Sequence, residues 1–126
     1  MPPLSLVIPA NPGERQRLIF VLMEKFKSLL DADDELLLRR PQPGVDIGAI
    51  DRCLGRSKLE RNACRARIDQ LRASDPYKFP DEQTLDKLET ALRALRDAIA
   101  GSAALSALIE ATDGVVETLG AASTEG

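Results

Sequence analysis

Histidine and tryptophan are both missing from this sequence of 126 residues. Histidine is the commonest general base, the commonest transition-metal ligand and the base of many nucleophilic triads. Its absence removes much hydrolase chemistry, so an enzyme built on this chain would depend on carboxylates, lysine or tyrosine. No spacing of those residues brings a convincing acid and base together. We therefore expect a protein that is not an enzyme and that needs no cofactor.

Cysteine is scarce, and only Cys53 and Cys64 are present. Two cysteines are too few for a disulfide framework, and they cannot complete a tetrahedral zinc site by themselves. The eight glycines are dispersed, and none lies in the phosphate-binding pattern G-x-x-x-x-G-K. We expect no metal site, and we interpret both cysteines as small buried apolar residues.

Long hydrophobic runs are also missing. The longest unbroken apolar run extends from Leu18 to Met23, far short of the roughly 20 residues that a membrane-spanning helix needs. The first residues carry neither the positive charge nor the long apolar stretch of a secretory signal. These observations predict a soluble protein that lies in the cytoplasm and does not bind membranes.

What the sequence does contain is apolar residues at helical spacing, in a chain that is 44% hydrophobic. Alternation of the strand type occurs nowhere, and the length suits one domain with its own core. We predict an all-α fold, namely a compact bundle of four to six helices with an antiparallel pair of long helices. Residues 1–119 are expected to form the domain, and residues 120–126 a disordered tail.

The first predicted helix begins at Asn11-Pro12-Gly13-Glu14, which combines a capping residue, an early proline and a glutamate three positions after the cap. Its apolar residues cover more than half of its circumference. They are Leu18, Ile19, Phe20, Val21, Leu22, Met23, Phe26, Leu29 and Leu30. Such a helix is either central to the core or covered by a partner. The acids of residues 31–35 are predicted to end it, and Pro41-Gln42-Pro43-Gly44 stops any helix.

The pattern of residues 46–72 predicts two helices. Asp46 can cap a short helix that ends at Gly55, and Ser57-Lys58-Leu59-Glu60 is a capping box that opens a second helix, which ends near Arg72. This arrangement partly resembles a helix-turn-helix unit. Asp51, Arg56 and Arg61 depart from that pattern, because they stand where it has small or core residues. These departures weaken a role in reading DNA sequence and leave open a two-helix hairpin that contacts only a nucleic-acid backbone.

The last third of the sequence carries a leucine seam. A helix is predicted to begin at Pro80-Asp81-Glu82. Its apolar residues recur three and four positions apart, at Leu85, Leu88, Leu92, Leu95 and Ile99. A second apolar stripe runs from Leu105 to Leu119, with a kink or break expected at Asp113-Gly114. This seam of residues 85–119 either closes the bundle or forms an interface, and the sequence leaves both open.

Positive charge is concentrated between Arg52 and Arg72. The formal net charge is −3, yet this segment has seven basic residues against two acids, Glu60 and Asp69. At 100° per residue, Lys58, Arg61, Arg65 and Arg72 fall within about 60° of arc. The predicted buried stripe, with Cys64, Ile68 and Leu71, lies farther round the helix. A cationic stripe of this kind can follow the phosphates of a nucleic acid.

The leading hypothesis is a small helical subunit that contacts the backbone of DNA or RNA, as a regulator or within a nucleoprotein complex. The candidate contact residues are Arg52, Arg56, Lys58, Arg61, Arg65, Arg72 and Lys78, and Arg39 and Arg40 could extend the patch. Tyr77 and Phe79 flank Lys78 and could stack on bases. Two alternatives stay open: a solvated helix face, and a helical adaptor that uses the 85–119 seam to bind protein partners or to self-associate.

Overall fold

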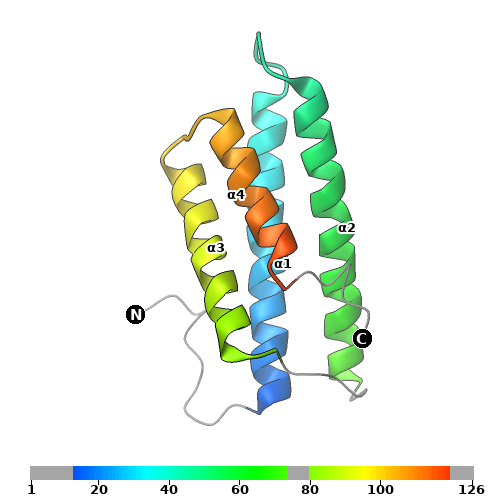
Figure 1. Ribbon diagram of the computed structural model, residues 1–126. Helices are drawn as coiled ribbons and strands as arrows, with labels where there is room; N and C mark the ends of the chain where they lie inside the picture. The colour runs from blue at the N-terminus through cyan, green and yellow to red at the C-terminus, as the bar shows by residue number, and fades with distance from the viewer. Residues whose placement is uncertain (1–12, 74–79, 120–126) are drawn as a thin grey trace.

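The computed structural model describes residues 13–73 and 80–119, which form four α-helices without any strand. The prediction of an all-α fold is confirmed. The helices are α1 (Glu14–Arg39), α2 (Ile47–Arg72), α3 (Glu82–Ala100) and α4 (Leu105–Glu117) (Figure 1). None of these helices is long and apolar enough to cross a membrane.

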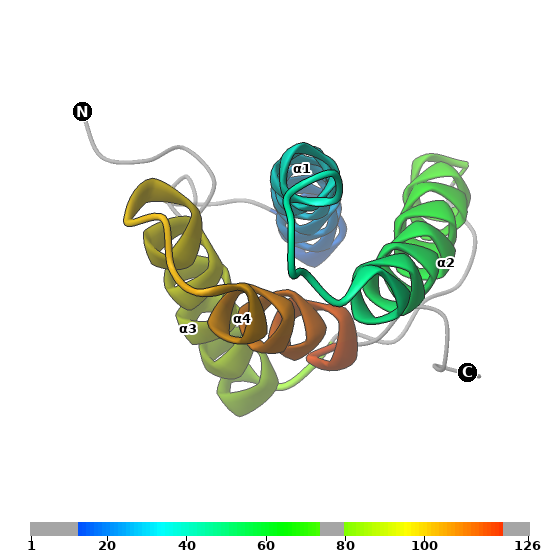
Figure 2. The ribbon, with the colours of Figure 1, turned by 90° about the horizontal axis from the view of Figure 1, so that it is seen from above.

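The helices are arranged as two hairpins. After the turn of residues 40–44, α2 runs back along α1, and α3 and α4 form the second hairpin (Figure 1). Seen from above, α1 and α2 lie side by side, and α4 packs against both of them (Figure 2). Gly44 has a φ of 80°, which is a left-handed conformation that glycine adopts without strain. The predicted break at residues 41–44 is therefore confirmed.

The leucine seam of α3 lies in the core. Leu85, Leu88, Leu92 and Leu95 are between 0 and 6% exposed, and they pack with Leu108 and Val115 of α4 and with residues of α1 and α2. A second apolar cluster joins the start of α1 to the end of α2. Because the four helices bury these four leucines against one another, their side chains do not form an open interface.

Helix α1 continues past the acids that were predicted to end it. Leu29, Ala32 and Leu36 are fully buried at helical spacing, so the core holds this part of the chain in a helix. Glu35 adds an ion pair with Arg39 one turn later. The predicted end at residues 31–35 is wrong, because tertiary burial outweighs the acidic composition.

Helix α2 is likewise one continuous helix, and the predicted end at Gly55 is wrong. Asp46 caps it as expected, since its carboxylate accepts a hydrogen bond of 3.0 Å from the Ala49 backbone N–H. The buried face, which includes Cys53, Ser57 and Glu60, then runs past Gly55 without interruption. Ser57 is an interior residue and not a cap. Without a turn at Gly55, the likeness to a helix-turn-helix unit is lost.

The second hairpin follows its predicted start but not its predicted break. Asp81 caps α3 by accepting a hydrogen bond of 2.7 Å from the Thr84 N–H. Helix α4 passes through Asp113-Gly114 as a regular helix. Three predictions fall outside the described residues. They concern the tail at 120–126, the aromatic pair Tyr77 and Phe79, and the candidate contact residue Lys78.

Candidate interaction surface on α1 and α2

Arg61, which was predicted to contact nucleic acid, is bonded to α1 of its own chain. Its Nη2 lies 3.0 Å from Oδ2 of Asp33, whose side chain is only 8% exposed. Burial raises the pKa of Asp33 above its ordinary value, and Ser57 and Arg61 offset part of that rise. The Ser57 hydroxyl lies close enough to this carboxyl to lower its pKa, but the geometry between the two groups does not meet the criteria for a hydrogen bond. Arg61 therefore neutralises a buried carboxylate.

Arg56 and the pair Arg39 and Arg40 are also engaged within the chain. Arg56 donates two hydrogen bonds of 3.0 Å to Asp113 of α4, which raises the pKa of Arg56. Arg40 binds Asp51 at 2.8 and 2.9 Å and lowers the pKa of that carboxyl. Arg39 binds Glu35 and donates a hydrogen bond to the Ala103 carbonyl. These arginines connect helices of this chain.

Three of the predicted cations form an exposed row on α2. Lys58, Arg65 and Arg72 are exposed, and none of them has an ion pair or hydrogen bond to another described residue. They lie seven residues apart along one edge of α2, which corresponds to roughly 10.5 Å of helix between neighbours. We name these three residues the cationic row. Arg52 is exposed as well, but it lies on the other edge of the exposed side of α2.

An apolar row on α1 was not identified as a site from the sequence. Met23, Leu30 and Leu37 are 45, 37 and 53% exposed, and they too lie seven residues apart. Phe26 is partly buried against the core beside them. The signal was present in the sequence as an apolar arc wider than a buried face needs. We name Met23, Leu30 and Leu37 the apolar row.

Two ion pairs show that both rows lie on one side of the molecule. Asp33 lies one turn from Leu30 and from Leu37, and its partner Arg61 lies one turn from Lys58 and from Arg65. The Arg40–Asp51 pair joins the same two flanks nearer the turn. The apolar row and the cationic row therefore lie on the same side of the paired helices, and together we call them the α1–α2 face.

A buried ion pair lies beneath this surface and was also missed. Nζ of Lys25 lies 2.8 Å from Oε2 of Glu60, and the two side chains are 0 and 2% exposed. The same ammonium donates hydrogen bonds to the carbonyls of Val116, Thr118 and Leu119 at the end of α4. A lysine between Leu22 and Leu29 on the apolar side of the first helix was the available signal. This pair fastens α4 to the α1–α2 hairpin.

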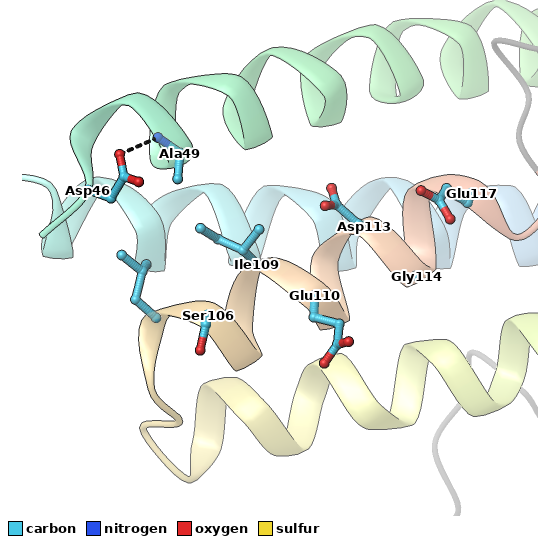
Figure 3. Close-up of a pocket in the computed structure, with 9 residues that line it drawn as sticks. Asp46, Ala49, Ser106, Ile109, Glu110, Asp113, Gly114 and Glu117 are labelled. Atoms are coloured by element: carbon cyan, nitrogen blue, oxygen red, sulfur yellow. Dashed lines mark hydrogen bonds between the residues drawn. The ribbon is translucent and has the colours of Figure 1, made fainter.

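A pocket of about 630 Å³ lies between the start of α2 and α4 (Figure 3). Its carboxylates are Asp46, Glu110, Asp113 and Glu117, and its apolar lining includes Leu105 and Ile109. Asp46 is occupied as the cap of α2, and Asp113 is held by Arg56. In Figure 3, Glu110 points away from Asp46. Asp46 and Asp113 thus stabilise the fold, and Glu110 does not point toward Asp46, as an acid–base pair would require.

The remaining candidates for chemistry are buried or dispersed. Both cysteines are fully buried, as expected, and burial raises the pKa of Cys53 to about 11 and that of Cys64 to about 12. Thiols with such pKa values are poor nucleophiles at neutral pH. Across residues 13–73 and 80–119, no three cysteine or carboxylate side chains are grouped so as to hold a metal ion.

Comparison with known proteins adds no relatives: no family model, curated protein or solved structure matches this chain.

Proposed function

We propose that this protein is a non-enzymatic helical adaptor that binds another protein through the α1–α2 face. In this proposal, the antiparallel long helices α1 and α2 of a four-helix bundle form the docking element. The observation that carries the proposal is the exposure of Met23, Leu30 and Leu37 in one line. Aligned apolar side chains on a surface are typical of interaction sites, because water contact with them is unfavourable.

Burial of the leucine seam moves the proposed interface from the 85–119 segment to α1. Leu92 and Leu95 have no exposed surface, whereas Leu37 is 53% exposed. A partner that covers the apolar row would gain roughly 25 cal/mol for each Å² of apolar surface removed from water. The cationic row beside it would add selectivity for the charge of the partner.

Contact with a nucleic-acid backbone is a second candidate, favoured by the open cations Lys58, Arg65 and Arg72. Two observations make it the weaker one. The apolar row, adjacent to these cations, has no counterpart on a phosphate backbone. Asp31 and Asp34 are exposed on α1, and Asp34 lies one turn from Leu30 and from Leu37, where its charge would repel phosphates.

A quantitative pull-down from the source cells tests the adaptor proposal. The bait proteins are the unchanged chain, the double variant Leu30→Asp/Leu37→Asp, and Thr90→Asp as a control on the exposed side of α3. We expect a discrete partner that the unchanged chain and the control retain and that the double variant loses. Identical sets of proteins on all three baits would contradict the proposal.

Gel-shift titrations at two salt concentrations, with unrelated duplex DNA and RNA, test the second candidate. Backbone contacts would give a shift that weakens steeply with salt and disappears in Lys58→Glu/Arg65→Glu/Arg72→Glu. No shift at low salt would remove the nucleic-acid candidate and leave the adaptor proposal in place.

A further inference from the structure

Both rows of the α1–α2 face have the same repeat. The apolar row recurs every seven residues on α1, and the cationic row recurs every seven residues on α2. Seven residues make about two turns of helix, or roughly 10.5 Å. A helix with a seven-residue apolar repeat, lying along this face, matches both spacings at once. The geometry of the face therefore suits a helix better than an irregular loop.

The chemistry of the two rows differs, and this difference specifies the occupant. Leu30 and Leu37 are complementary to leucine or isoleucine side chains. Lys58, Arg65 and Arg72 carry no ion pair with described residues, so they are complementary to glutamate or aspartate on one flank of a bound helix. Asp31 and Asp34 lie on the other side of the apolar row, where they favour a basic or neutral flank.

We propose that the α1–α2 face binds an amphipathic helix of a partner protein, with apolar residues in a seven-residue repeat and acidic residues on the flank that faces α2. This inference depends on the adaptor function proposed above and adds the chemistry of the partner. From Met23 to Leu37 the apolar row spans 14 residues, or roughly 21 Å of helix. A bound segment of about three heptads covers both rows.

Two synthetic peptides of three heptads test this inference. They share the same leucine and isoleucine positions, and their flanking positions are all glutamate in the acidic peptide and all lysine in the basic peptide. Fluorescence anisotropy measures the binding of each labelled peptide, below the concentration at which it self-associates. The protein variants are the charge reversal Lys58→Glu/Arg65→Glu/Arg72→Glu and a control with the same net charge, Arg52→Glu/Lys87→Glu/Arg93→Glu. Circular dichroism verifies that each variant is helical.

We expect the unchanged protein to bind the acidic peptide at least about tenfold more tightly than the basic one. The three cations of the cationic row attract the glutamates of the acidic peptide and repel the lysines of the basic peptide. The charge reversal should invert this preference, and the control variant should keep it. Added salt should weaken the binding of the acidic peptide to the unchanged protein.

Other outcomes overturn the inference in distinguishable ways. Equal affinity for both peptides, lost in Leu30→Asp, would reject an acidic partner while protein binding stands. Absence of peptide binding, combined with a dimer that Leu30→Asp converts to a monomer, would assign the face to a second copy of this chain. Binding of labelled duplex alone, lost in the charge reversal, would assign the cationic row to phosphates. If neither peptide binds and the pull-down is also unchanged by Leu30→Asp/Leu37→Asp, then both the inference and the adaptor function fail.

Discussion

The ammonium group of Lys25 lies 2.8 Å from the carboxylate of Glu60, and both side chains are almost completely buried. The last carbonyls of a helix lack partners within the helix and carry partial negative charge. Lys25 donates hydrogen bonds to the carbonyl of Val116 in the last turn of α4, to that of the cap residue Thr118 and to that of Leu119 just beyond. One buried cation therefore connects α1, α2 and the end of α4. Loss of either charge would break this buried ion pair.

The variant Lys25→Met should lower the free energy of unfolding by about 3–5 kcal/mol, because it removes the charge that pairs with the buried Glu60 carboxylate. Urea denaturation followed by circular dichroism measures the loss. The double variant Lys25→Met/Glu60→Leu should cost less than the sum of the single variants, since it removes both charges. Strictly additive losses would mean that the two side chains are not coupled.

Substitution of Gly55 by alanine should stabilise the protein. A Cβ at this position meets no atom within 4 Å, and the residue lies in the middle of α2. Alanine is favoured over glycine in a helix interior by roughly 0.5–1 kcal/mol, so the urea midpoint should rise. Gly44→Ala serves as the opposite control, because a φ of 80° is strained for alanine. A destabilised Gly55→Ala protein would indicate a turn at this position and not a continuous helix.

Arg61→Ala and Arg65→Ala should differ in stability although both remove one arginine from the same stripe. Arg61→Ala should cost about 1–3 kcal/mol, because it deprives the buried Asp33 of a charged partner. Arg65→Ala should stay within about 0.5 kcal/mol of the unchanged protein, as is usual for an exposed residue.

The dependence of the Arg61→Ala deficit on pH provides a second check. The pKa of Asp33 is raised in the folded protein by burial. Ionised Asp33 therefore lowers the free energy of unfolding, and this loss grows as the pH rises from the ordinary pKa of an aspartate through the raised pKa of Asp33. Removal of Arg61 raises this pKa further. The deficit should therefore shrink when acid protonates Asp33, and a deficit that stays constant down to pH 3 would be inconsistent with this explanation.

Much of this architecture could be read from the sequence. The helical class, the turn at residues 41–44, the leucine spacing of α3 and the buried cysteines all follow from local spacing and composition, whereas the burial of those leucines does not. The errors occurred where tertiary contacts override local signals. The acids of residues 31–35 read as a helix end, but Leu36 is held in the core. Gly55 read as a stop, but a continuous buried face passes it.

The candidate site was less predictable than the fold. Whether Arg61 faces solvent or a carboxylate depends on Asp33, which is 28 residues earlier in the chain and on another helix. The same holds for Arg56 and Asp113. Which part of the apolar arc of α1 stays exposed depends on where α2, α3 and α4 pack. These relationships between distant residues are not encoded in helical periodicity.

Alkaline pH should destabilise the protein through its buried thiols. Burial raises the pKa values of Cys53 and Cys64 from 9.0 to about 11 and about 12. Above pH 9 the folded state then holds more protons than the unfolded state. The contribution of the protonated thiols to the free energy of unfolding is therefore complete below pH 9 and declines as the pH rises. The decline should approach about 1.4 kcal/mol per pH unit for each thiol.

The variant Cys53→Ala/Cys64→Ala is the control for this effect. Its unfolding free energy should fall less steeply between pH 8 and pH 10.5 than that of the unchanged protein, because lysines and arginines titrate equally in both. Parallel curves for the two proteins would show that the thiols do not contribute to the alkaline slope.

Amide chemical-shift mapping by nuclear magnetic resonance shows which surface of the protein binds an acidic helix. The acidic three-heptad peptide is titrated into isotopically labelled protein, and shifts are followed for every backbone amide. We expect shifts that are confined to residues 23–37 of α1 and 58–72 of α2, with residues 82–117 of the second hairpin nearly unchanged. Shifts centred on α3 and α4, or on the pocket near Ile109, would contradict the assignment of the α1–α2 face as the docking surface.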